Sequence, residues 1–109
     1  MPFSTRTLGN EQVSALGLGC MGMTQSYSSF GGFDEEESMR TLDAAHAMGM
    51  NFWDTADMYG PESNERLLGK WFKRTGKRND IFLATKFANT YKDGKLLGKV
   101  KGDHVRCKF

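Results

Sequence analysis

The stretch Asn51–Gly60 reads NFWDTADMYG, and it decides how the rest of the chain is interpreted. An apolar run, Phe52 and Trp53, ends abruptly in Asp54, and a polar loop that carries Tyr59 follows. This pattern is typical of a buried strand that delivers polar side chains to the end of a sheet. Taken alone, the stretch also allows a structural interpretation, in which Asp54 caps a turn and Tyr59 packs.

A second apolar run ends in an ionisable residue in the same way. Residues 81–85 read IFLAT, and Lys86 follows them directly. The carboxyl ends of parallel strands meet at one edge of a sheet, which would bring Asp54, Tyr59 and Lys86 together. We therefore interpret these three residues as one candidate site.

The order of the expected elements predicts a parallel α/β fold. A short hairpin is expected over residues 6–16, because two strand-like runs flank Asn10-Glu11. Strands and helices then alternate, with strands at residues 16–20, 51–54 and 81–86 and helices at residues 34–47 and about 61–75. Short strands with polar carboxyl ends favour the N-terminal part of a (β/α)8 TIM barrel, with an N-terminal β-hairpin and about three βα units.

Local signals mark the ends of the two expected helices. Asp34, with Glu37 three residues later, resembles a capping box, and Gly76 is a fitting end for the second helix. The second helix carries an apolar stripe that we interpret as core packing, formed by Leu67, Leu68, Trp71 and Phe72.

The glycines at positions 17, 19 and 22 spell G-x-G-x-x-G, the dinucleotide fingerprint. That fingerprint requires a helix to start at once, so that the helix N-terminus meets the pyrophosphate. Residues 23–33 instead form a polar, glycine-rich stretch. We therefore expect these glycines to permit a tight turn or the close approach of a ligand, and we do not predict a Rossmann domain.

The alternating pattern loosens after Lys86. Residues 89–102 contain the turn signal Asp93-Gly94 and scattered lysines, and we expect an exposed loop there.

Composition bounds the class of protein. The 109 residues have a net charge of +2, which is too small to predict a nucleic-acid partner. No apolar run approaches the roughly 20 residues that span a bilayer, and no secretory signal is visible at the start. The two cysteines, Cys20 and Cys107, form no metal-ligand spacing with His46 or His104. We expect a cytoplasmic protein with reduced thiols, no metal and no membrane association.

The candidate site residues and their neighbours resemble the N-terminal part of an aldo-keto reductase. Four segments carry the resemblance: residues 18–22 (LGCMG), 52–60 (FWDTADMYG), 64–69 (NERLLG) and 84–87 (ATKF). It extends from about residue 6 to residue 106, and plant and fungal reductases with a G-C-M-G start look most similar. The resemblance implies a (β/α)8 barrel that uses NADPH to reduce a small aldehyde or ketone to an alcohol.

The resemblance also implies a role for each site residue. Tyr59 would give a proton to the carbonyl oxygen, because a neighbouring ammonium, Lys86, stabilises the phenolate that remains. Asp54 would hold Lys86 charged and oriented. Residues near the nicotinamide would be Gly19, Met21, Gly22 and Asp54. Met23 and Tyr59 would contact the substrate.

The chain ends before the family's fourth barrel strand, where that family places a catalytic histidine. His104 precedes this strand, and we do not assign it that role. We therefore expect residues 1–109 to form a partial NADP-dependent oxidoreductase domain that binds cofactor poorly and turns over little. A second hypothesis is a non-catalytic remnant that associates with itself, with full-length subunits or with other partners through its exposed barrel edge. A third gives Lys86 the role of a Schiff-base nucleophile of the class I aldolase type.

Overall fold

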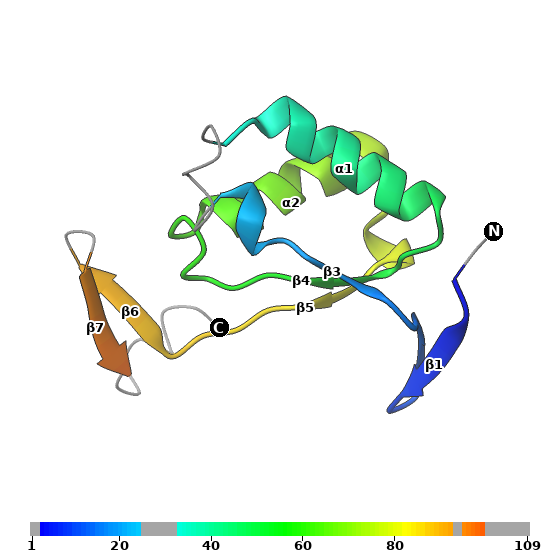
Figure 1. Cartoon of the computed structure of the whole chain (residues 1–109), viewed down its shortest axis with the longest axis horizontal. Helices are drawn as coiled ribbons and strands as arrows, with labels where there is room; N and C mark the ends of the chain where they lie inside the picture. The colour runs from blue at the N-terminus through cyan, green and yellow to red at the C-terminus, as the bar shows by residue number, and fades with distance from the viewer. Residues whose placement is uncertain (1–2, 25–32, 93–94, 100–109) are drawn as a thin grey trace.

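A three-stranded parallel sheet forms the centre of the computed structural model, which describes residues 3–24, 33–92 and 95–99 (Figure 1). Its strands are β3 (Gly17–Gly19), β4 (Phe52–Asp54) and β5 (Phe82–Ala84), in the order β3-β4-β5. The register pairs Leu18 with Trp53 and Trp53 with Leu83. The parallel α/β class predicted from the alternating pattern is therefore confirmed.

Two helices, α1 (Glu35–Ala47) and α2 (Ser63–Thr75), lie on one side of this sheet (Figure 1). The Asp34 side chain caps α1 by accepting hydrogen bonds from the backbone N–H groups of Glu36 and Glu37. Gly76 ends α2 in the left-handed conformation with a φ of 69°. The predicted cap by Asp34 and the predicted end of the second helix are confirmed. The Glu37 carboxylate, the other half of the predicted capping box, instead accepts from Arg40.

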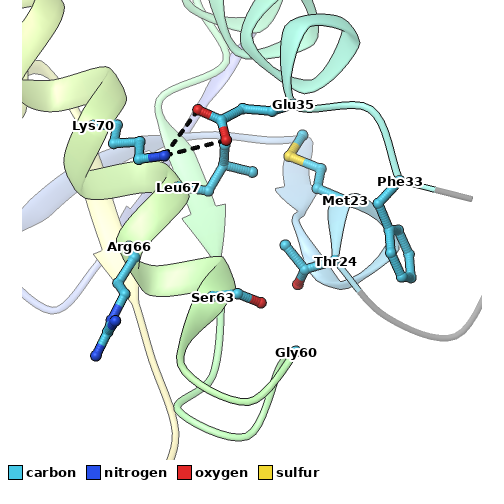
Figure 2. Close-up of a pocket in the computed structure, with 9 residues that line it drawn as sticks. All are labelled: Met23, Thr24, Phe33, Glu35, Gly60, Ser63, Arg66, Leu67 and Lys70. Atoms are coloured by element: carbon cyan, nitrogen blue, oxygen red, sulfur yellow. Dashed lines mark hydrogen bonds and ion pairs between the residues drawn. The ribbon is translucent and has the colours of Figure 1, made fainter.

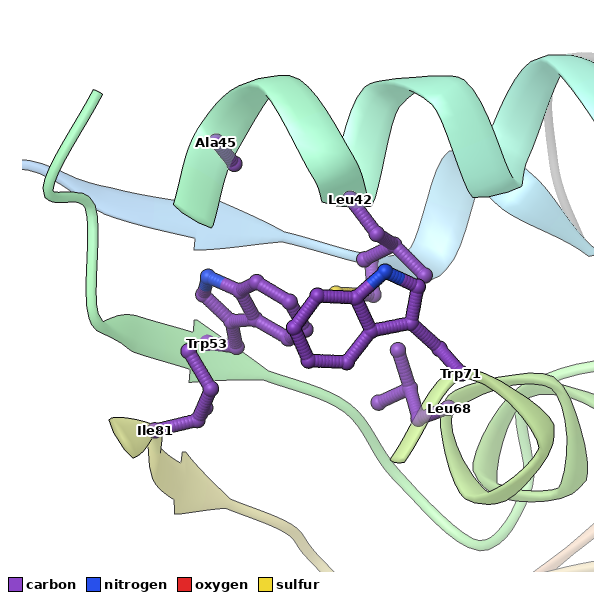
Figure 3. Close-up of a cluster of buried hydrophobic side chains, with 7 residues drawn as sticks. Leu42, Ala45, Trp53, Leu68, Trp71 and Ile81 are labelled. Carbon is purple, nitrogen blue, oxygen red and sulfur yellow. The ribbon is translucent and has the colours of Figure 1, made fainter. Parts of the chain in front are cut away.

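The core lies between the two helices and the sheet (Figure 3). Trp53 from β4 and Trp71 from α2 are both buried, and their ring centroids are 4.8 Å apart in an edge-on arrangement. Such an aromatic pair contributes about 1 kcal/mol beyond the burial of its area. The cluster also includes Cys20, Leu42, Ala45, Leu68 and Ile81. The apolar stripe of α2 therefore packs in the core, as its spacing predicts.

The register of the strands gives the sheet a second face that points away from the helices. Leu18 and Leu83 pack against the core cluster on either side of Trp53. Neighbouring residues in a strand point to opposite faces, so the row that pairs Gly19, Asp54 and Ala84 faces the other way. The candidate catalytic aspartate therefore stands on the face that the helices leave uncovered.

The predicted N-terminal hairpin is confirmed, with strands β1 (Thr5–Leu8) and β2 (Glu11–Ser14) paired antiparallel. It joins the sheet through Ser14, which is buried. The Ser14 backbone N–H donates to the Asn51 side chain at 2.7 Å, and the Asn51 backbone N–H donates to the Ser14 hydroxyl at 3.1 Å. This reciprocal pair ties the hairpin to the start of β4.

The expectation of an exposed loop after residue 88 is wrong for residues 89–92 and 95–99. These residues form a second antiparallel hairpin, β6 (Asn89–Lys92) and β7 (Lys95–Lys99), beyond the carboxyl ends of the parallel strands (Figure 1). The Asp93-Gly94 pair is a hairpin signal when strands flank it. The scattered lysines on both sides are more typical of a loop, and for this reason the pattern predicts a loop here. Residues 100–102 of that prediction, together with His104 and Cys107, lie outside the described residues.

The described residues hold three parallel strands, and this sheet does not close on itself. The structure therefore shows a mixed α/β arrangement of the kind found in part of a barrel. In the described part of the chain, neither helix is long and apolar enough to cross a bilayer. The described residues also form short 3₁₀ turns, η1 (Met21–Met23) after β3 and η3 (Arg78–Asp80) before β5.

Candidate active site

Lys86 is the centre of a compact polar cluster at the carboxyl ends of β4 and β5. Its Nζ atom donates to Asp54 Oδ2 at 2.6 Å, to the Thr55 carbonyl at 2.9 Å and to Tyr59 Oη at 3.3 Å. An ammonium group has three hydrogens, so these three acceptors use all of its donors. The structure thus brings together the three residues that the sequence placed in one site.

The pairing of neighbouring strands explains why these side chains meet. Asp54 is the last residue of β4, and Lys86 lies two residues beyond the end of β5. Backbone hydrogen bonds continue the pairing past the strand ends, from Thr55 N to the Ala84 carbonyl at 2.8 Å and from Asp57 N to the Lys86 carbonyl at 3.1 Å. The two loops therefore leave the sheet side by side.

A tight turn places Tyr59 over the lysine. The Tyr59 backbone N–H donates to the Ala56 carbonyl, and the Tyr59 carbonyl accepts from Asn64 N at the start of α2. Gly60 follows with a φ of +90°, and a Cβ atom there would collide with the Ser63 hydroxyl. Glycine is therefore required at position 60. The Lys86 ammonium lies 5.0 Å from the centroid of the Tyr59 ring.

The electrostatics of the cluster keep Lys86 charged. Partial burial lowers the pKa of Lys86, but hydrogen bonds to Asp54 and Tyr59 outweigh it and raise the pKa above its ordinary value. The ammonium has no acceptor, so Tyr59 Oη accepts this bond and keeps its own proton for another partner. The Lys86 and Asp54 side chains are 49% and 43% exposed, and such an ion pair adds little to stability.

The charge on Lys86 also bears on the Schiff-base hypothesis. A lysine that attacks a carbonyl must do so as a neutral amine, which requires a lowered pKa. Lys86 has the opposite shift and two oxygen partners besides the phenol. The geometry therefore counts against the aldolase-type role.

The glycine-rich end of β3 lies beside the cluster. Gly19 pairs with Asp54 in the sheet register, and Cys20 N donates to the Asp54 carbonyl at 2.9 Å. A Cβ atom on Gly19 would meet no atom within 4 Å, so the strand end is open at that position. Met21 and Gly22 follow directly in η1. These features fit the expectation that a ligand approaches the backbone here.

Met23, the predicted substrate contact, lies at the edge of a separate hollow of about 600 Å³ between η1 and the first turns of α1 and α2 (Figure 2). Its apolar side is formed by Met23, Phe33 and Leu67. A Glu35–Lys70 ion pair of 3.1 Å lies across it. Asp54, Tyr59 and Lys86 are not among its described lining residues. No described contact joins Met23 to the lysine cluster.

Two residues of the site carried no predicted role. Thr55 is buried and gives its carbonyl to Lys86, and Asn64 is buried under the loops. The helical spacing of α2 could have revealed Asn64, because positions 64, 67, 68 and 71 all lie on the inward face. A polar residue in an inward position must find buried partners.

Comparison with known proteins identifies the class of this site. The family model described as the Aldo/keto reductase family matches residues 15–106. The chain belongs to the aldo/keto reductase family. The match includes all three residues of the lysine cluster and the open end of β3.

Individual aldo/keto reductases support the assignment. An aldo-keto reductase of Strobilurus tenacellus is 54% identical over 93 residues, which cover 83% of this chain and 27% of the relative. An NADP(+) aldo-keto reductase of Schizosaccharomyces pombe is 47% identical over 87 residues, 80% of this chain and 25% of the relative. The chain thus spans about a quarter of these curated relatives.

A solved structure gives the same result for the fold. The holo form of an aldo-keto reductase from Bacillus halodurans superposes with a TM-score of 0.71 and 39% identity. The superposition covers 90% of this chain and 30% of that chain. The arrangement of short parallel strands and covering helices is therefore that of part of an aldo/keto reductase.

Proposed function

We propose that residues 1–109 form the N-terminal part of an NADPH-dependent carbonyl reductase, within a (β/α)8 barrel domain. The substrate would be a small aldehyde or ketone and the product an alcohol. The observation that carries the proposal is the Lys86 ammonium, which contacts both the Asp54 carboxylate and the Tyr59 hydroxyl. Because the described residues hold three parallel strands and such a barrel has eight, we expect weak cofactor binding and slow turnover from this chain.

The proposed mechanism assigns a proton to Tyr59. A carbonyl becomes an alcohol when its carbon gains a hydride and its oxygen gains a proton, and bound NADPH supplies the hydride. Tyr59 gives its hydroxyl proton to the carbonyl oxygen. Lys86 stabilises the phenolate that remains, because its ammonium already donates to Tyr59 Oη. Asp54 keeps Lys86 charged and pointed at the phenol.

The residues at the end of β3 fit a cofactor. Gly19 presents open space in place of a side chain, on the sheet face that also carries Asp54. We propose that Gly19, Met21, Gly22 and Asp54 lie along the nicotinamide half of NADPH. The printed name of the Schizosaccharomyces pombe relative includes NADP(+), which supports this choice of cofactor. Met23 would contact the substrate from the neighbouring η1 turn.

A second candidate function is association without catalysis. The Phe52 and Phe82 rings meet edge to face with their centroids 5.4 Å apart, and both residues are half buried. They lie on the face of the sheet opposite to the one that α1 and α2 cover. An aromatic pair on an open face of a parallel sheet favours a partner that covers it. A second copy of this chain presents the same aromatic pair and could cover it.

Carbonyl reduction is tested on the purified chain with NADPH and a panel of aldehydes and ketones. We expect slow NADPH oxidation that depends on the carbonyl compound. Tyr59→Phe should lower it by about 100-fold or more, because a general acid contributes about that factor. Tyr91→Phe, the same substitution at another tyrosine of the chain, is the matched control. Equal turnover in wild type and Tyr59→Phe would refute the mechanism.

Cofactor binding is tested separately by NADPH fluorescence with hydrogen exchange on the same sample. We expect binding to increase the protection of amides in β4. A chain with protected β4 amides that does not respond to NADPH would contradict the cofactor site and favour association.

A further inference from the structure

Each parallel strand is followed directly by a residue that hydrogen-bonds to one of two neighbouring residues of α2, Asn64 or Glu65. Cys20 follows β3, Thr55 follows β4 and Thr85 follows β5. Asn64 binds the first two and Glu65 binds the third. We propose that Asn64 and Glu65 are positioning residues, which align the three strand ends and thereby hold Lys86 over Asp54 and Tyr59. The positioning role itself does not depend on the proposed function. Only its purpose, the alignment of Lys86 for carbonyl reduction, rests on that function.

Asn64 satisfies every polar group of its side chain inside the protein. Its Nδ2 group donates to the Cys20 carbonyl at 2.7 Å and to Thr24 Oγ1 at 2.9 Å, while Oδ1 accepts from Thr55 Oγ1 at 2.5 Å. The residue is 0% exposed, so water cannot replace these partners. An amide offers both donors and an acceptor at one place, whereas a carboxylate offers only acceptors. The three contacts therefore require the residue type found at position 64.

Thr55 links Asn64 to Lys86, because it forms hydrogen bonds with both residues. Its hydroxyl donates to Asn64, and its carbonyl accepts from Lys86 Nζ at 2.9 Å. Thr55 is also fully buried, and its backbone N–H is held by the Ala84 carbonyl. A shift of Thr55 would move one of the three acceptors that orient the ammonium. Asn64 thus acts on Lys86 through one intervening residue.

Glu65 acts on the lysine from the other side. Its Oε2 atom accepts from the Thr85 hydroxyl at 2.8 Å, and Thr85 immediately precedes Lys86. The backbone of α2 adds a further link, because Asn64 N donates to the Tyr59 carbonyl at 3.1 Å. The first turn of α2 therefore touches the chain beside Lys86 and at Tyr59 itself. A helix turn is a rigid support, and a site built on it keeps its geometry.

The test measures how strongly Lys86 is held, and it needs no turnover. An amine-reactive reagent labels lysines as neutral amines, and mass spectrometry gives the labelling rate of Lys86 relative to exposed Lys73 in one sample. Across pH 8–10 we expect Lys86 to react more slowly than Lys73 in wild type, because its pKa is raised. Thr55→Val, which replaces the hydroxyl with a methyl group of similar size and removes the hydrogen bond to Asn64, should increase the ratio several-fold. Thr55→Ser should restore it.

Variants of the two positioning residues complete the test. Asn64→Leu and Glu65→Ala should increase the Lys86 ratio, and Glu65→Gln, which keeps an acceptor for Thr85, should leave it low. Asp43→Ala is the control for general destabilisation, because it removes the Trp71 and Arg74 hydrogen bonds between α1 and α2, which involve none of Thr55, Asn64 and Glu65. It should lower the melting temperature without a change in the ratio.

The outcomes separate this proposal from the proposed function. An unchanged Lys86 ratio in folded Thr55→Val and Glu65→Ala overturns the positioning role, whatever the NADPH assays show. Increased ratios in the variants, together with a wild-type chain that neither binds NADPH nor reduces carbonyls, support the positioning role and contradict the carbonyl reduction proposed for this chain. An equal increase in Asp43→Ala would show that the ratio reports general loosening, and it would also overturn the proposal.

Discussion

At the scale of single residues, the candidate site depends on charge and on empty space. Lys86 keeps its ammonium charged through oxygen partners from three residues, and its hydrogen bond makes the Tyr59 oxygen an acceptor. Gly19 contributes the absence of a side chain at the point where the sheet is open. Both features come from residues that patterns in the sequence identified. Their mutual distances depend on the sheet.

Gly19 gives the first prediction. Because a Cβ atom at this position meets nothing within 4 Å, Gly19→Val should change the free energy of unfolding by less than about 1 kcal/mol. If NADPH lies against this strand end, the added isopropyl group should weaken NADPH binding about 10-fold or more. Fluorescence titration and urea unfolding on the same variant check both parts. Gly69→Val, whose added Cβ also meets no atom within 4 Å, is a control on α2 that should leave binding unchanged.

Cys20 gives the second prediction. Burial raises the pKa of the Cys20 thiol from 9.0 to about 12, so the folded chain keeps a proton that the unfolded chain releases above pH 9. The free energy of unfolding should therefore decrease as the pH rises from about 9 to about 12, and this contribution is fully present below pH 9. Cys20→Ala should lack that part of the slope when urea midpoints are compared at pH 8, 9.5 and 10.5.

Thiol labelling provides an independent check on Cys20. Cys107→Ser leaves Cys20 as the single thiol of the chain. At pH 8 its reaction with a disulfide reagent should be slow in the folded protein and fast in urea, because the thiolate is the reactive form. Fast labelling of the folded chain would show that Cys20 is neither buried nor protonated as the structure indicates.

At the scale of elements, helix ends are the features that the sequence specifies best. The Asp34 side chain satisfies two backbone N–H groups at the start of α1, and Gly76 ends α2 in a conformation that favours glycine. Both signals act within a few residues of chain, so tertiary structure is not needed to interpret them. The β6–β7 hairpin shows the limit, because its Asp93-Gly94 turn signal is local but the scattered lysines beside it do not form a clear strand pattern.

The cap of α1 gives the third prediction. Asp34→Ala removes the acceptor for two backbone N–H groups and should reduce the free energy of unfolding by about 1 kcal/mol. Asp34→Asn keeps a side-chain oxygen and should recover most of that loss. Urea unfolding of the two variants checks the order, and a loss of equal size in both would attribute the effect to charge at the helix N-terminus rather than to the cap.

At the scale of the whole molecule, the described sheet has one covered and one uncovered face. The helices and the core cluster occupy the side of Trp53, while Asp54 and the Phe52–Phe82 pair lie on the rows that point away from it. In the proposed barrel the uncovered face is the interior, where further strands would bury it. The same face explains why catalysis and association are competing functions for this chain.

The uncovered face gives the fourth prediction. Sedimentation velocity should show association of the chain alone or with a full-length aldo/keto reductase. Phe82→Ser should weaken it roughly 30-fold, because burial of one phenylalanine contributes about 2 kcal/mol. Phe33→Ser removes a phenylalanine that is 49% exposed elsewhere and should have little effect. A monomer at all concentrations, alone and in the mixture, would reject association.

The sequence by itself determined the alternation of strands and helices, the caps, the N-terminal hairpin and the three residues of the lysine cluster. Each of these features depends on residues that are close together in the sequence, or on a residue at the abrupt end of an apolar run. Only the tertiary structure decided which of these residues contact one another. Lys86 and Asp54 are 32 residues apart, and they meet because the register of the parallel strands sets which residues leave the sheet together. Asn64 and Cys20 are 44 residues apart, and they meet because the buried face of α2 packs against the end of β3. Register is a property of paired strands, and a single strand does not contain it.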